Sequence, residues 1–486
     1  MKLLILILVV IINCVVAQEF GFANVWVTTV DGTVLFEEQE PAMFKWLDSS
    51  SQEDNPSDID VVISVNNDTA YQRVYGYGGA LTQSSAYLFT QLLEQNKEYG
   101  TEILNKLFSQ DQGIGITMIR VPASACDFSL SNYTYDDIPN DTALTNLSIA
   151  IDQQYTIPIL NLILEINPAI KLIYSPWSAP SWMKSSDSLD YGELLPSMYD
   201  VYTDFFVKFL ELYYYHENIE IYAITLQNEP LFQPMTYPGM YVNSSVESQL
   251  VKLLGPKLEK SGLNTQIFIY DHNWNAPEYP MDILQDPDAY EYVGASAFHC
   301  YAGDVTNQSL VHDQFPDKEI HMTECSSGAW SPEFGENLIW QSQNLYIGSI
   351  ENWSSSVLLW NFALDLEDGP TNHGCLDCRG FITVNNTNYQ SVQFNVEYYG
   401  TAHYSKFLSD PSYRVQSTQY FPNPNAEYLQ TCISSIAFQN QGDNTNHLVV
   451  LNACNTTVSL QMNVGLQNKY LNYNLPMGLT TFYWAI

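Results

Sequence analysis

Two glutamates in this sequence each end a short apolar run. Glu229 lies in IYAITLQNEP (residues 221–230), and Glu324 lies in EIHMTECSSG (residues 319–328). In both segments, β-branched and apolar residues lead to a carboxylate, and polar, turn-forming residues follow. A carboxylate at the carboxyl end of a buried parallel strand packs poorly and is well placed for chemistry. The two residues are 95 positions apart (324 minus 229), which fits two strands of one barrel with their carboxylates on a shared rim.

Two facing carboxyl groups have the chemistry needed to break a glycosidic bond. In a retaining enzyme one protonates the leaving oxygen and the other attacks the anomeric carbon, with the two groups about 5 to 5.5 Å apart. The acid must stay protonated, so we expect low polarity and a nearby negative charge to raise its pKa. Asn228 can bind a sugar hydroxyl, and Trp177 and Trp360 offer flat apolar faces to a sugar ring.

These residues require a scaffold of parallel strands. Short apolar runs alternate with amphipathic stretches such as 85–107 and 200–216. The predicted strands are 116–121, 171–175, 221–226, 266–270, 293–298, 319–323 and 357–360, and the segment 75–80 supplies an eighth. Polar or aromatic side chains follow most of these runs: Arg120, Trp177, Asn228, Glu229, Asp271, His272, His299, Tyr301, Glu324, Trp360 and Asn361. This pattern predicts an α/β fold, a (β/α)8 TIM barrel with its active site at the carboxyl ends of the strands.

Both chain ends have a different pattern, with short strands and turns. The N-terminal candidates are residues 23–29, 33–36 and 59–65, and the C-terminal ones are residues 427–434, 446–452, 457–462 and 480–485. We expect the two sets to form one β-sandwich. The predicted organisation is a signal peptide at 1–17, sandwich strands at 18–78, the catalytic barrel at 79–400 and the rest of the sandwich at 401–486.

The N-terminus and the charge indicate the secretory pathway. Residues 1–17 carry one lysine, an apolar stretch and a terminal alanine, which is typical of a signal peptide; a membrane anchor is the alternative. Glycosylation triplets start at Asn67, Asn132, Asn140, Asn146, Asn243, Asn307, Asn352, Asn385 and Asn455. A net charge of −37 excludes nucleic acid as a partner and fits either a soluble surface or an acidic compartment. No later segment is long enough to span a membrane.

Cysteine spacing predicts at least one disulfide. Of eight cysteines, Cys14 leaves with the signal peptide, so an odd number remains and at least one thiol is free or paired outside the chain. Cys375 and Cys378 are expected to form a loop disulfide, with a redox or zinc pair as the alternative. For Cys325 we expect buried packing. The sequence predicts no metal site, and glycosidic cleavage needs no cofactor.

Several long motifs resemble one known family. They are YGYGGALT (75–82), MIRVPASACDFS (118–129), SPWSAPSWMK (175–184), TLQNEP (225–230) and WNFALDLEDGP (360–370). In this order they are similar to the glucosylceramidases of glycoside hydrolase family 30, from about residue 20 to the end. The resemblance implies a barrel with a β-sandwich and a retaining mechanism.

The resemblance also implies roles for single residues. Glu229 would be the acid/base and Glu324 the nucleophile, while Arg120 and Asp127 would help to hold the glucose. Substrate contacts are further implied for Trp177, Asn228, His299, Tyr301 and Trp360. Arg120 could instead be only an ion-pair partner of Asp127 or Glu324, and Asp127 a turn or cap residue. Trp182, Trp274 and Trp330 are expected to be packing or rim residues.

The main functional hypothesis is a lysosomal or secreted β-glucosidase that hydrolyses glucosylceramide. An anionic lipid surface and a saposin-like activator are possible partners. The alternatives are a secreted β-glycanase of the same family, such as a β-1,6-glucanase, and a non-catalytic carbohydrate-binding glycoprotein. The segment GCLDCRG (374–380) looks like that of other branches, including microbial glucanases. Substrate preference is expected to depend on the loops 185–198, 231–241 and 330–337.

Overall fold

The computed structural model describes residues 21–46, 59–465 and 469–485. The predicted signal peptide lies outside these residues. The described chain forms two compact units. One unit comprises residues 75–332 and 344–406, and the other comprises the described parts of 1–74, 333–343 and 407–486.

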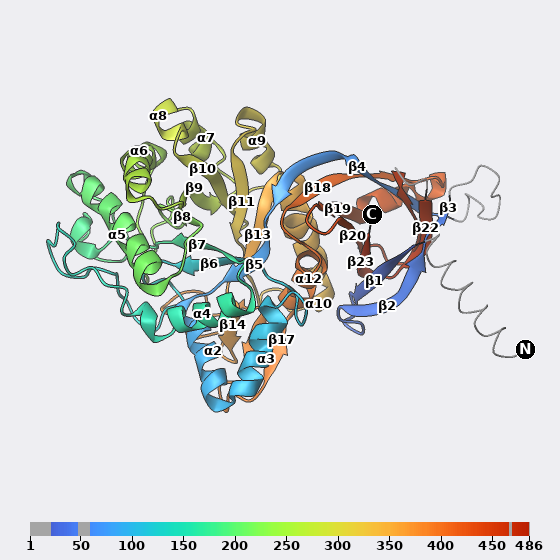
Figure 1. The fold of residues 1–486 in the computed structure, drawn as a ribbon, viewed down its shortest axis with the longest axis horizontal. Helices are drawn as coiled ribbons and strands as arrows, with labels where there is room; N and C mark the ends of the chain where they lie inside the picture. The colour runs from blue at the N-terminus through green and yellow to red at the C-terminus, as the bar shows by residue number, and fades with distance from the viewer. Residues whose placement is uncertain (1–20, 47–58, 466–468, 486) are drawn as a thin grey trace, which may run out of the picture. The chain divides into compact units, whose positions relative to one another are not determined.

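The first unit is a closed barrel of parallel strands, which confirms the predicted fold (Figure 1). Each strand pairs with its neighbours in parallel, and β13 pairs with β5 to close the ring. The strands are β5 (Gly76–Ala80), β6 (Met118–Pro122), β7 (Lys171–Ser175), β8 (Ala223–Thr225), β9 (Gln266–Asn273), β10 (Val293–His299), β11 (Glu319–Glu324) and β13 (Ser354–Leu359).

Side chains of medium and small size fill the barrel interior. One buried cluster takes residues from six strands: Met118, Ile173, Ala223, Phe268, Ala295, Ala297 and Leu358. Strand β5 needs glycine to approach its neighbour, because a Cβ on Gly78 would lie 1.7 Å from the Met118 carbonyl oxygen. The interior is therefore a packed core, and the space for a ligand lies at the strand ends.

Helices connect the strands and cover the barrel from outside (Figure 1). They are α2 (Gln83–Gln95), α3 (Lys97–Phe108), α4 (Thr156–Ile166), α5 (Tyr199–Glu217), α6 (Ser244–Ser261), α7 (Glu278–Leu284), α8 (Pro287–Tyr290), α9 (Asn307–Gln314), α11 (Gly348–Glu351) and α12 (Val396–Ser405). The predicted helix 85–107 is two helices. Asn96 separates them with an extended backbone, and its side chain caps α3 by accepting from the Tyr99 N–H. None of the described helices has the length and hydropathy needed to cross a bilayer.

The second unit is a ten-stranded sheet with contributions from both chain ends, as predicted for the sandwich. Its order is β2-β1-β23-β20-β19-β18-β4-β21-β22-β3. The strands are β1 (Phe22–Thr29), β2 (Glu37–Met43), β3 (Lys45–Trp46), β4 (Val61–Val74), β18 (Ser412–Tyr420), β19 (Ile433–Asn440), β20 (Thr445–Asn452), β21 (Val458–Val464), β22 (Lys469–Leu475) and β23 (Gly478–Ala485). Inward side chains of both ends, including Val25, Ile63, Leu448 and Phe482, form one apolar core. Helix α10 (Phe334–Gln341) also belongs to this unit.

Two strand predictions at the chain ends are wrong. Residues 33–36 form a turn, in which Phe36 has a φ of 51°, and β2 begins only at Glu37. Residues 427–431 belong to a 3-10 helix, η6 (Pro424–Thr431), which precedes β19. Strands β18 and β22 were not predicted, because their alternating polar residues resemble loop composition.

Candidate active site

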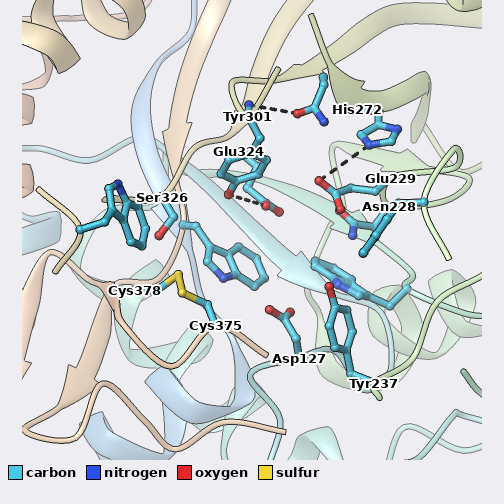
Figure 2. Close-up of a pocket in the computed structure, with 15 residues that line it drawn as sticks. Asp127, Asn228, Glu229, Tyr237, His272, Tyr301, Glu324, Ser326, Cys375 and Cys378 are labelled. Atoms are coloured by element: carbon cyan, nitrogen blue, oxygen red, sulfur yellow. Dashed lines mark hydrogen bonds and ion pairs between the residues drawn. A yellow bond between two sulfur atoms is a disulfide. The ribbon is translucent and has the colours of Figure 1, made fainter. Parts of the chain in front are cut away.

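A pocket of about 420 Å³ lies at the carboxyl ends of the barrel strands (Figure 2). Most of its lining residues follow directly on a strand or belong to the loops behind the strands. They are Asp127, Trp177, Asn228, Glu229, Phe232, Tyr237, His272, Asn273, Tyr301, Glu324, Ser326, Trp330, Trp360, Cys375 and Cys378.

The two glutamates of the sequence prediction both line this pocket. Glu324 is the last residue of β11, and Glu229 follows β8 with a φ of 49°, a left-handed conformation that turns the chain sharply at this point. A carboxylate oxygen of Glu229 and one of Glu324 lie within 4.8 Å of each other. This separation fits direct attack by one carboxylate and is shorter than the roughly 6.5–9.5 Å that leaves room for a water between them.

Arg120 holds Glu324 from inside the barrel. Its Nη1 donates to Glu324 Oε2 at 2.5 Å, and its Nη2 donates to Asn228 Oδ1 at 2.6 Å. The guanidinium also lies 4.9 Å from the ring centroid of Trp177. Arg120 is fully buried and does not line the pocket, so it positions the carboxylate from behind. Of the two ion-pair partners considered for Arg120, the structure shows Glu324 and not Asp127.

Asp271 anchors the base of the site, although it was not among the predicted site residues. Tyr270 and Asp271 have φ values of 77° and 52°, and the register between β9 and β10 shifts next to them. The carboxylate of Asp271 is fully buried, and the charge of Arg120 helps to hold its pKa well below the usual value against the effect of burial. Five side chains donate to it or pair with it at 2.6 to 3.0 Å: Arg120, Ser175, Thr225, His299 and Thr323.

His299 links Asp271 to Glu229. Its Nε2 lies 3.0 Å from Asp271 Oδ1, and its Nδ1 lies 3.3 Å from Glu229 Oε1. Burial lowers the pKa of His299, but the charges of Glu324 and Asp271 outweigh burial and raise it to about 9. His299 is therefore an imidazolium at neutral pH, and like Arg120 it does not line the pocket.

The expectation of a raised pKa for Glu229 is wrong for the free protein. Burial raises the pKa of Glu229, but the hydrogen bond to His299 and the positive charge of His299 outweigh burial and lower it. A protonated His299 therefore lies 3.3 Å from the carboxylate of Glu229. His272 adds a neutral neighbour, because burial lowers its pKa to about 4, and its Nε2 lies 4.0 Å from Glu229 Oε1.

Tyr301 lies on the other side of Glu324. Its hydroxyl donates to Glu324 Oε1 at 2.8 Å (Figure 2), while Arg120 holds Oε2. Both oxygens of Glu324 therefore have a donor, which fixes the carboxylate without protonating it. The side chain of Tyr301 lines the pocket, as expected for a residue near the catalytic pair.

Two tryptophans and two polar side chains form a buried end of the pocket. Trp177 and Trp360 are each 3% exposed, and their rings stack with centroids 5.3 Å apart. Asn228 and Asp127 also line the pocket, and Asp127 Oδ1 has no hydrogen-bond partner among the described residues. Burial and the charge of Glu324 raise the pKa of Asp127 well above its usual value. A sugar hydroxyl at this end would satisfy an otherwise unpaired polar atom.

Trp330, which was expected to be a packing or rim residue, lines the pocket at its exposed side. It is 55% exposed, and Phe232 is 45% exposed. It lies at the start of the loop 330–337, on which substrate preference was expected to depend, and its position agrees with the rim alternative. Trp182 and Trp274 do not line the pocket and are buried.

The cysteines form three disulfides in the described residues. Cys375–Cys378 is confirmed and lines the pocket. Cys325 is buried as expected, but it is also bonded to Cys300, because the register shift at the end of β10 brings Cys300 opposite it. The third disulfide joins Cys432 and Cys454, and Cys126 is a free buried thiol, in agreement with the odd number.

One group of side chains has donor atoms that could hold a metal ion. It consists of Glu229, His299 and Glu324, whose ligand atoms lie within 4.8 Å of one another. These atoms are already paired, since Glu229 contacts His299 and Glu324 accepts from Arg120 and Tyr301. A cation would have to displace the proton of His299. The absence of a metal requirement stays a prediction.

Comparisons with known proteins agree with this geometry. Residues 74–408 match the glycosyl hydrolase family 30 TIM-barrel domain. The endo-1,6-beta-D-glucanase neg1 of Aspergillus fumigatus is 33% identical over 69% of this chain and 70% of its own length. The lysosomal acid glucosylceramidase of Mus musculus is 28% identical over 74% of this chain and 73% of its own. A solved endo-beta1,6-glucanase superposes with a TM-score of 0.85 at 30% identity, covering 96% of this chain and all of that one. The chain is a glycoside hydrolase and belongs to glycosyl hydrolase family 30.

Proposed function

We propose that this protein is a retaining endo-β-1,6-glucanase in which Glu324 is the nucleophile and Glu229 the acid/base. The observation that carries the retaining mechanism is the separation of less than 4.8 Å between oxygens of the two carboxylates. The choice of substrate is supported by the relatives, because an endo-1,6-beta-D-glucanase is 33% identical and a glucosylceramidase 28% identical.

In the first step Glu324 attacks the anomeric carbon. A C–O bond forms between this carbon and a Glu324 oxygen, the glycosidic C–O bond breaks, and the leaving oxygen takes a proton from Glu229. This proton reaches Glu229 from His299 over their 3.3 Å contact before the glycosidic bond breaks, so Glu229 is ionised and His299 neutral when the step is complete. The anionic state of Glu324 is supported by donation from Arg120 and Tyr301.

In the second step Glu229 acts as a base on water. The water oxygen bonds to the anomeric carbon, its proton goes to Glu229, and the bond to Glu324 breaks. While Glu324 is esterified it carries no charge, so one of the two carboxylates that raise the pKa of His299 is lost. The neutral His299 then binds a proton less tightly, so it takes the proton of Glu229 back only when Glu324 is released as a carboxylate.

The predicted substrate contacts follow from the lining of the pocket. Trp177, Trp360, Asn228 and Asp127 surround the sugar to be cleaved. The unpaired Asp127 Oδ1 forms a hydrogen bond with one hydroxyl of this sugar. Arg120 and His299 act through the two glutamates instead of touching the sugar. Tyr301 contacts Glu324 and lies within reach of the ligand space.

Glucosylceramide is the second candidate substrate. The exposed apolar side chains Leu231, Phe232 and Met235 lie in the loop behind β8 and favour it, because they could contact a lipid. A net charge of −37 disfavours an anionic lipid surface at neutral pH, so this candidate depends on acidification or on a saposin-like activator.

The protein is further proposed to be a glycoprotein of the secretory pathway, extracellular or lysosomal. Residues 1–17 and the glycosylation triplets support this. Asn132, Asn140, Asn146, Asn243 and Asn455 are exposed, and Asn67, Asn307, Asn352 and Asn385 are partly buried. Glycans are therefore expected first at the exposed positions.

A direct comparison of substrates tests the proposal. The purified protein is given linear β-1,6-glucan, linear β-1,3-glucan and glucosylceramide with and without anionic lipid, at mildly acidic pH. Release of short β-1,6-linked oligosaccharides supports the proposed function, and Glu324→Gln serves as the inactive control. Turnover of glucosylceramide together with an intact β-1,6-glucan would contradict it.

A further inference from the structure

We propose that Trp330 forms a second sugar-binding position, which holds the glucan residue next to the one bound between Glu229 and Glu324. The inference rests on the proposed function, because it assumes a chain of β-linked sugars as substrate. It assigns the binding of this neighbouring sugar to one residue, Trp330, of a loop on which substrate preference was expected to depend.

The aromatic residues of the pocket differ strongly in exposure. Trp177 and Trp360 are each 3% exposed and stacked on each other, next to the buried Arg120. Trp330 lines the same pocket but is 55% exposed. The buried pair therefore surrounds a single enclosed sugar, and Trp330 lies where a longer substrate would leave the pocket. An exposed indole at this place would be covered by the neighbouring sugar.

The backbone beneath Trp330 fixes the position of its ring. A Cβ on Gly328 would lie 2.1 Å from Trp330 Cζ3, so the indole packs directly on the glycine. Gly328 belongs to β12 (Ser327–Gly328), which pairs with β15 (Cys378–Arg379), and the Ala329 N–H donates to the Asp377 carbonyl at 2.8 Å.

A disulfide closes the loop that leads into β15, the strand that pairs with β12. Cys378 pairs with Gly328 across the two strands and is bonded to Cys375. Both cysteines line the pocket beside Trp330. The ring is thus held in place before a ligand arrives, which reduces the entropy lost on binding.

The chemistry of this surface favours a neutral sugar. An indole offers a flat apolar face that stacks on the C–H face of a pyranose ring, and its N–H can reach a hydroxyl. The net charge of −37 disfavours an anionic lipid surface as the occupant. A glucan carries no charge and is not repelled.

The experiment compares two ligands of different length. One is linear β-1,6-glucan, for which kcat and KM are measured, and the other is deoxynojirimycin, an inhibitor the size of one sugar, for which the inhibition constant is measured. The proteins are the wild type, Trp330→Ala, Trp330→Phe and Trp340→Ala. Trp340 is a matched control, because it is 44% exposed and does not line the pocket.

Trp330→Ala is expected to lower kcat/KM on the glucan about tenfold, mainly through KM, which corresponds to roughly 1.4 kcal/mol. Its inhibition constant for deoxynojirimycin should equal that of the wild type. Trp330→Phe should retain more of the wild-type kcat/KM on the glucan than Trp330→Ala. Trp340→Ala should have the wild-type value.

Two results would overturn the inference while the proposed function stands. One is wild-type glucan kinetics in Trp330→Ala, and the other is equal weakening of the glucan and of deoxynojirimycin. A wild-type protein that leaves the β-1,6-glucan intact would overturn the proposed function itself, and the second sugar position with it.

Discussion

The buried His299 makes a quantitative prediction about pH. It lies between Asp271 and Glu229, is fully buried, and has its pKa raised to about 9. In the unfolded chain its pKa returns to about 6.5. Replacing it in His299→Gln removes the titrating group and keeps a side chain that can donate a hydrogen bond.

The size of the effect follows from the two pKa values. A raised pKa means that the folded state binds the proton more tightly, so the stabilisation is complete below pH 6.5 and disappears as pH rises through about 9. The difference between the folded and unfolded pKa values of His299 corresponds to about 3 kcal/mol of unfolding free energy. No correction for solvent screening is needed, because the side chain is 0% exposed.

The assay is urea unfolding of both proteins at several pH values between 5.5 and 9.5, a range spanning both pKa values of His299. The difference in unfolding free energy between wild type and His299→Gln should shrink by about 3 kcal/mol across this range. His403→Gln is a control with the opposite sign: burial lowers the pKa of His403 to about 3, so only the unfolded chain binds a proton there below about pH 6.5, and the difference between wild type and His403→Gln should grow, not shrink, as pH rises.

Activity provides a second readout of the same variant. Without the imidazolium, Glu229 loses the neighbour that lowers its pKa most, and its pKa rises, but the catalytic proton is then held by a carboxyl group instead of by an imidazolium with a pKa of about 9. The alkaline limb of the kcat/KM profile, which reports the loss of this proton, should therefore move to lower pH in His299→Gln. A difference in stability that does not change with pH, together with an unshifted alkaline limb, would refute the reasoning.

Three further substitutions test other parts of the site. Asp271→Asn removes the buried carboxylate that pairs with both Arg120 and His299, so it should lower the free energy of unfolding in urea by about 3–5 kcal/mol. A loss below about 1 kcal/mol would show that the protein does not need the charge of Asp271 for stability. Tyr301→Phe removes the 2.8 Å hydrogen bond to Glu324, and kcat should fall about 10- to 100-fold with an unchanged melting temperature; an effect on KM alone would speak against this role. Lys184 donates to Ser178 Oγ and to the Leu189 and Gly239 carbonyls, which joins the loops 185–198 and 231–241, and burial lowers its pKa to about 7. Because the unfolded chain binds this proton more tightly, the wild type should gain stability between about pH 7 and 10.5, and Lys184→Met should not; parallel curves for the two proteins would refute the assignment.

Residues with a strong local pattern were predictable from the sequence. The barrel strands have continuous apolar runs, and Glu229 and Glu324 stand at the ends of two of them. Parallel strands put such ends on one rim, so the pocket could be predicted without a structure. The segment 33–36 misled the prediction, because its apolar residues lie in a turn with a positive φ at Phe36.

Features that depend on long-range contacts were missed. Asp271 gains its role from partners on five other strands, which no window of sequence contains. The Cys300–Cys325 disulfide arises from a register shift between β10 and β11. Similarly, the lowered pKa of Glu229 depends on His299, 70 positions along the chain (299 minus 229).

The central claim is that Glu324 forms a covalent bond to the sugar while Glu229 handles the proton. The most direct measurement is mass spectrometry of peptides after incubation with a 2-deoxy-2-fluoro β-glucosyl fluoride, which forms the intermediate but releases it slowly. The predicted result is one glucosyl adduct on the peptide that contains Glu324, and none in Glu324→Gln. An adduct on Glu229, or hydrolysis that inverts the anomeric centre without any adduct, would contradict the account.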